Sequence, residues 1–108
     1  MEARTYYAGR RSLGIGGMLA SNLEVQAVDR AGLRPLEHHA RWSDAGFDWG
    51  GGRDGALELA YALLRDLTGM FPSLELCREL AEGVLRELPL DGFVLADAEL
   101  LAWLDVRA

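Results

Sequence analysis

The sequence predicts an α+β domain in which a small antiparallel sheet, made of an N-terminal hairpin and one short late strand, packs against three helices. Three observations predict this class. The first third alternates β-prone segments with glycine-containing turns, residues 54–105 contain three stretches with helical spacing of apolar residues, and a short β-prone run separates the second stretch from the third. With 108 residues, we expect one domain, 1–108, built around a single core.

The expected strands cover residues 5–7, 23–28, 33–36 and 93–95. The first should end at Gly9, which places Arg10 and Arg11 in or after a turn. A turn of hairpin length joins the second strand to the third. Pro35 cannot donate a backbone hydrogen bond, so the third strand should lie at an edge of the sheet.

The expected helices cover about 55–67, about 72–88 and 98 to about 105. The first is apolar on nearly all sides, which is typical of a helix in the middle of a fold. Asp54 is its natural N-cap, and Gly69 suits its C-terminal cap. Pro89 should end the second helix, and Asp97 should cap the third.

Charge is distributed unevenly along the chain. Residues 1–36 carry a net charge of +2 and residues 37–108 a net charge of −8, which together give the formal −6. An acidic domain repels phosphate backbones, so we expect no direct nucleic-acid binding. We expect instead a protein partner with a basic surface, such as the groove of a nucleic-acid-handling protein. The candidate contact is the acidic outer face of the second helix, formed by Glu75, Glu79 and Glu82.

Five arginines of the first third provide the opposite electrostatic preference. As a patch they would suit an acidic or phosphate-bearing partner. They are Arg4, Arg10, Arg11, Arg30 and Arg34.

The single cysteine, Cys77, excludes a disulfide framework and lies at a core-facing position of the second helix. A reducing setting fits this usage best. No signal-peptide pattern and no run of about 18 apolar residues is present, so we expect a cytoplasmic protein without a membrane span.

A glycine-rich run precedes the first helix. Gly50, Gly52 and Gly55 match the spacing G-x-G-x-x-G of dinucleotide-binding turns. No buried parallel strand precedes it and Asp48 and Asp54 flank it, so we disfavour a nucleotide.

Two other interpretations of the run remain. The favoured one is a tight turn that brings Phe47 and Trp49 against the first helix. The alternative is a small-ligand or anion site at the N-terminus of that helix. Its residues would be Gly50, Gly51, Gly52 and Arg53.

Catalytic and metal-binding signals are weak. His38 and His39 are adjacent, whereas a zinc site needs three or four converging ligands. A reactive thiol needs an electropositive and partly exposed position, which a core-facing cysteine lacks. We expect no metal and no cofactor. An enzyme that uses one of these histidines with Asp44 or Asp48 stays a third alternative.

Several segments together resemble a bacterial domain-of-unknown-function family, number six-one-six-six. Its motifs correspond here to residues 7–10, 28–32, 46–50 and 57–64 and to Trp103. Gly51 stands where the family has a tyrosine. The resemblance implies no known reaction and no catalytic residues, but it suggests a phage, plasmid or other mobile-element context.

Together these observations favour a non-enzymatic protein-interaction module. By analogy with small acidic proteins of mobile elements, it would inhibit a host nucleic-acid-processing complex, as anti-CRISPR proteins do. Homodimerisation through Trp42, Trp103 or the edge strand stays open.

Overall fold

The computed structural model describes residues 4–13, 20–37, 39, 47, 49, 54–89 and 92–107. Its elements follow the predicted order β, β, β, α, α, β, α, and the predicted α+β class is confirmed. The strands are β1 (Thr5–Leu13), β2 (Ala20–Asp29), β3 (Gly32–Pro35) and β4 (Gly92–Ala96). The helices are α1 (Asp54–Thr68), α2 (Leu74–Gly83), the 3-10 turn η1 (Leu85–Glu87) and α3 (Asp97–Arg107).

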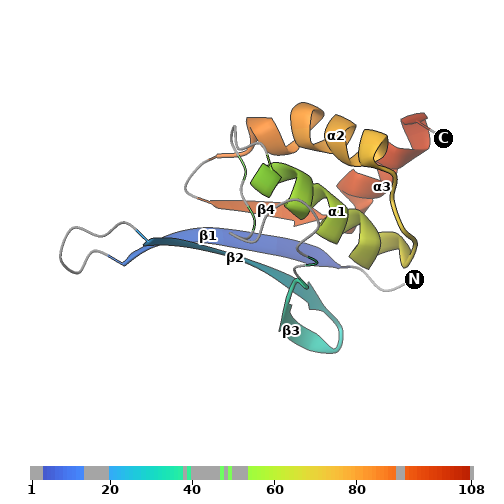
Figure 1. Ribbon diagram of the computed structural model, residues 1–108. Coiled ribbons are helices and arrows are strands. Elements are labelled where there is room, and N and C mark those ends of the chain that lie inside the picture. Colours follow the sequence, from blue (N-terminus) through green and yellow to red (C-terminus); the bar gives the residue numbers. More distant parts are fainter. Residues whose placement is uncertain are drawn as a thin grey trace.

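The four strands form one antiparallel sheet in the order β3-β2-β1-β4. β3 lies at an edge, as Pro35 predicts, and the late strand β4 pairs with β1 at the other edge. Figure 1 shows the helices gathered on one side of the sheet, with α1 between α2 and the strands. The register explains how the two faces differ, because side chains alternate along a strand.

One cross-strand row faces the helices. Tyr6 is paired with Ala27 of β2 and Leu95 of β4, and all three side chains are buried. The next row, through Tyr7, faces away from the helices, and Tyr7 and Val94 are exposed there. The sheet therefore has one covered face and one open face.

The core is built around α1, whose residues 58–64 are all buried. Phe47 and Trp49 belong to the same buried cluster, which confirms that they are seated in the core. The Trp49 indole Nε1 donates to the Pro89 carbonyl at 2.7 Å, and its ring packs edge-on against Phe93 at 5.0 Å. Cys77 is buried as predicted.

Both helix boundaries around the connection of α1 and α2 have clear causes. Gly69 adopts φ +72°, and its N–H donates to the Arg65 carbonyl at 2.8 Å. This is the αL cap that the sequence predicts. Ser73 is the N-cap of α2, since its hydroxyl accepts from Leu76 N at 3.1 Å. α1 itself begins at Asp54, one residue earlier than expected.

The first strand is longer than predicted. We expected Arg10 and Arg11 in or after a turn, but β1 continues to Leu13 and pairs Arg10 with Leu23 and Arg11 with Asn22. The prediction was wrong because it took Gly9 as the end of the strand. An antiparallel partner supplies ladder hydrogen bonds that carry the chain through a glycine.

The second helix is shorter than predicted. It ends at Gly83, and the chain continues through the tighter turn η1 rather than as α-helix to Leu88. The Leu88 N–H donates to the Leu85 carbonyl, an i to i+3 bond that is typical of a 3-10 turn. Glycine lowers helix propensity at this point, and the turn still buries Leu85. Within the described part of the chain, no helix is long and apolar enough to cross a membrane.

Candidate functional site

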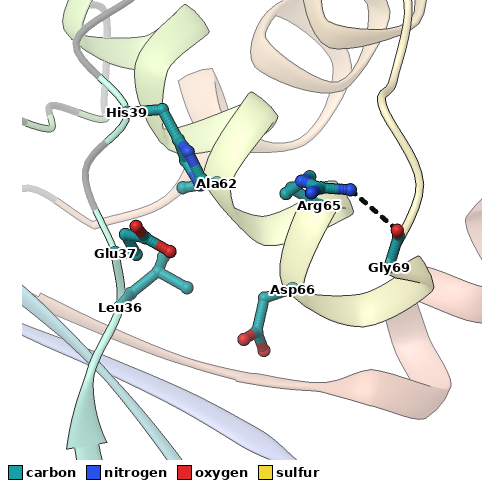
Figure 2. A pocket seen from close by; sticks show the side chains of 7 residues that line it. All are labelled: Leu36, Glu37, His39, Ala62, Arg65, Asp66 and Gly69. Atoms are coloured by element: carbon teal, nitrogen blue, oxygen red, sulfur yellow. Dashed lines mark hydrogen bonds between the residues drawn. The ribbon is translucent and has the colours of Figure 1, made fainter.

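A pocket of about 270 Å³ lies beside the last turns of α1. Figure 2 shows it between the segment that follows β3 and the C-terminal half of this helix. Its lining carries both signs of charge, and its volume lies just below the roughly 300 Å³ at which small-molecule sites begin. The lining residues are Leu36, Glu37, His39, Ala62, Arg65, Asp66 and Gly69.

Asp66 is the most highly bonded side chain of the pocket lining. Its Oδ2 accepts from Arg4 Nη1 at 3.0 Å and from the Tyr6 hydroxyl at 2.8 Å. Its Oδ1 accepts from Arg34 Nη2 at 2.7 Å. Arg4 also donates to the Asp66 carbonyl at 2.8 Å and lies 3.6 Å from Asp29. This cluster joins α1 to β1 and β3, so we call it the Asp66 joint.

The joint also keeps the Tyr6 phenol protonated. Burial of the phenol, followed by its hydrogen bond to the Asp66 carboxylate, raises the pKa of Tyr6 well above its ordinary value. Tyr6 is therefore a hydrogen-bond donor throughout the physiological range. Because both Asp66 oxygens accept hydrogen bonds from other segments, the joint ties α1 to the sheet.

Arg65 points away from the other charged groups of the pocket. Its Nη1 donates to the Gly69 carbonyl at 2.7 Å, the contact drawn in Figure 2. Its guanidinium carbon lies 3.9 Å from the centroid of the Phe71 ring. Arg65 thus binds the chain that leaves α1, and does so by hydrogen bonding and by a cation–π contact.

His39 and Glu37 supply the remaining titratable groups of the pocket. The imidazole of His39 packs edge-on against Tyr61, with ring centroids 5.2 Å apart. The predicted catalytic partners Asp44 and Asp48, and also His38, lie outside the described residues, so that alternative stays a prediction. Among the described residues, no group of three histidines, cysteines or carboxylates is placed to hold a metal ion.

Next to this pocket, the connection between α1 and α2 exposes large apolar side chains. Met70 is 71% exposed, Phe71 76% and Leu74 44%. The connection is nonetheless well fixed. Thr68 Oγ1 donates to the Leu64 carbonyl at 2.7 Å and accepts from Met70 N at 3.1 Å, in addition to the Gly69 cap. We call Met70, Phe71 and Leu74 the apolar corner.

The acidic face of α2 continues from this corner. Its predicted residues Glu75, Glu79 and Glu82 are all exposed, at positions i, i+4 and i+7 of one helix. Glu79 is partly neutralised, because Arg107 Nε lies 3.2 Å from its Oε2. The guanidinium of Arg107 is itself stacked 3.8 Å over Trp103.

The structure places only part of the second predicted surface. Arg4 and Arg34 bind Asp66 in the joint, although the Arg34 side chain is still 42% exposed. Arg30 is exposed in the turn between β2 and β3, and the side chains of Arg10 and Arg11 lie outside the description. The glycines and Arg53 of the predicted anion site, Gly50, Gly51, Gly52 and Arg53, also lie outside the described residues.

Sequence reasoning missed both Asp66 and the apolar corner. The joint leaves no local signal, because its donors come from two segments that are distant from Asp66 in the sequence. The corner does leave one. Met70 and Phe71 follow a helix-capping glycine and precede Pro72, where a connection is usually polar.

Comparison with known families now adds to this geometry. The family described as "Family of unknown function (DUF6166)" matches residues 7–106. The chain belongs to this family. The match begins within β1 and ends within α3, so it includes Arg34, Asp66 and the corner residues but not Arg4 or Tyr6. No curated protein and no solved structure was found to match.

Proposed function

We propose that this DUF6166 member is a protein-interaction module that binds its partner through the apolar corner and the acidic face of α2. The observation that carries the proposal is that Phe71 is highly exposed and yet held in place by Arg65. An exposed aromatic side chain contributes little to folding, whereas aromatic and methionine anchors are enriched in the cores of protein interfaces.

Preorganisation strengthens the argument. Ordering a mobile side chain at an interface costs about 0.5–1.5 kcal/mol of conformational entropy. In the corner, part of this entropy is already lost when the chain folds. Three sets of contacts fix the backbone of the few residues before Phe71. They are the αL cap at Gly69, the Thr68 hydrogen bonds and the Arg65 contacts. Burial of the Phe71 ring in a partner pocket would then contribute on the order of 2 kcal/mol.

The acidic face specifies the kind of partner. Glu75, Glu79 and Glu82 border the corner and favour a basic surface, since complementary charge speeds association and excludes wrong partners. A nucleic-acid-binding groove of a host protein combines such charge with apolar pockets. We therefore propose an inhibitor of a host nucleic-acid-processing complex, acting in the cytoplasm and borne by a phage or plasmid in the manner of anti-CRISPR proteins.

A partner-capture experiment tests this proposal. The protein, carrying a photo-crosslinker at the exposed position Arg78 of α2, is added to a lysate of its bacterial host, and crosslinked proteins are identified and then purified for binding measurements. We expect one partner with a basic surface, bound at least tenfold more weakly by Met70→Ser/Phe71→Ser. Leu33→Ser, an exposed apolar residue on β3, is the matched control and should bind normally.

The charges are tested separately. Glu75→Gln/Glu79→Gln/Glu82→Gln should weaken binding about three- to tenfold at low salt and much less at 0.5 M NaCl, because salt screens exposed charges. Glu87→Gln/Glu99→Gln/Asp105→Gln removes the same charge at other exposed positions. Equal loss in both triple variants would contradict a specific acidic contact.

The small-ligand alternative has its own test. A ligand that binds the folded state raises the melting temperature by mass action. Thermal-shift measurements with nucleotides and inorganic phosphate should show no stabilisation under our proposal. A shift abolished by Arg53→Ala would establish the anion site instead.

A further inference from the structure

The face of the sheet opposite the helices is open and apolar. Two cross-strand rows form it over the four-stranded part. One row runs through Tyr7, paired with Gln26 and Val94, and the other through Thr5, paired with Val28 and Ala96. Leu33 and Pro35 of β3 extend these rows at the edge. Figure 1 shows no helix on this side.

Exposed apolar side chains gather on this face. Val94 is 62% exposed, Leu33 66% and Tyr7 42%. Val94 and Tyr7 are direct cross-strand neighbours, so their side chains form one continuous surface. A sheet normally buries one face and solvates the other with polar residues. Here the outer face keeps an apolar character that folding does not use.

The distribution of charge bears on which molecule this face could bind. The two rows contain no carboxylate and no guanidinium, although the chain as a whole carries a net charge of −6 and Glu24 stands in the next row of the same face, opposite Gly9. Two copies repel each other wherever their acidic surfaces meet, and the open sheet face is a surface on which they can meet without that repulsion. A basic partner, in contrast, would find no charge to recognise here.

We infer that this open face is a self-association surface, on which a second copy of the chain packs sheet against sheet about a two-fold axis. A two-fold contact brings the same neutral patch to both sides, and twisted sheets stack face to face about 10 Å apart with their strands roughly aligned. The helices and the apolar corner then lie on the outside of the dimer.

The size of the face sets the strength of the contact. Four strands about 4.8 Å apart and five paired positions about 3.4 Å apart give a face of roughly 15 by 17 Å. The area of this face, roughly 250 Å², is far below the about 800 Å² that each partner buries in a stable complex. We therefore expect a weak dimer. Its two copies should separate on dilution.

Sedimentation equilibrium of the full chain from about 5 to about 500 µM tests this inference. The wild type should pass from monomer mass toward twice that mass, whereas Val94→Lys and Leu33→Lys should stay monomeric at every concentration. Phe71→Lys adds the same charge at the corner and should associate like the wild type. Circular dichroism melting of each variant confirms that it is folded.

Salt provides a second readout. Screening reduces repulsion between two acidic copies, so association on a neutral face should be unchanged or stronger at 0.5 M NaCl. A wild type that is monomeric at about 500 µM would overturn the inference. So would association that survives Val94→Lys, or that is abolished by Phe71→Lys, since the latter assigns self-association to the corner. Partner binding at the corner is measured separately and does not depend on this result.

Discussion

The C-terminal end of α1 and the corner that follows it use their side chains in opposite ways. At Asp66, two arginines and a tyrosine from the strands converge on one carboxylate, and the charges are satisfied inside the molecule. Four to eight residues later, Met70, Phe71 and Leu74 are exposed to solvent. In both regions arginine side chains hold a neighbouring group in place. Arg4 and Arg34 bind Asp66, and Arg65 packs against Phe71.

This difference separates residues that maintain the fold from residues that are available to a partner. Arg4 and Arg34 are charged groups near the surface, but their geometry assigns them to the joint between the sheet and α1. Arg65 likewise holds the Phe71 ring in place by a cation–π contact, but that ring remains exposed. Fixed groups with buried partners stabilise the fold, whereas fixed and exposed apolar groups are those for which we propose a role in recognition.

Asp66→Asn should produce the largest loss of stability. It removes the charge that neutralises Arg4 and Arg34, and we expect about 3 kcal/mol of destabilisation in urea unfolding at neutral pH. Asp105→Asn, at an exposed position of α3, is the control and should change stability by less than about 0.5 kcal/mol. Equal effects of the two variants would remove the distinction between joint and surface.

Tyr6→Phe should cost about 1–2 kcal/mol at neutral pH, through loss of the hydrogen bond to Asp66. Its pH dependence is more specific. The folded state raises the pKa of Tyr6, so this contribution is fully present below the unfolded value of about 10 and is lost as pH rises above it. Unfolding measured from pH 8 to 11 should show a steeper alkaline loss in the wild type than in the variant. Parallel curves would contradict the buried donor.

Gly69→Ala should have a smaller effect, of about 1 kcal/mol, because its φ of +72° disfavours any side chain although no atom lies within 4 Å of the added Cβ. Gly69→Ala separates the two regions, since a shifted helix cap should disturb the apolar corner but not the Asp66 joint. We expect weaker partner binding with the alkaline transition of Tyr6 unchanged. Gly83→Ala, where no positive φ is involved, is the control.

Much of the fold could be predicted from local patterns. Proline chemistry placed β3 at an edge, and the apolar periodicity of α1 placed that helix in the core. Phe47 and Trp49 were correctly assigned to the core. The end of β1 was not, because it depends on pairing with β2 rather than on Gly9 itself.

The site residues were harder to predict for a physical reason. Asp66 is 62 residues from Arg4, 60 from Tyr6 and 32 from Arg34. No periodicity within one segment reports such a meeting, which follows only from packing α1 onto the sheet. The shared exposed face of Glu75, Glu79 and Glu82 could be predicted because helical spacing alone places them together, and its role in binding stays a prediction.

The most direct test combines the two regions in one experiment. For the captured partner, binding and urea stability are measured for wild type, Phe71→Ser and Asp66→Asn. The account predicts that Phe71→Ser loses at least tenfold in affinity with less than about 0.5 kcal/mol change in stability. Asp66→Asn should lose stability and, wherever it remains folded, bind normally. Normal binding by Phe71→Ser, together with lost binding by folded Asp66→Asn, would contradict the account and assign recognition to the pocket.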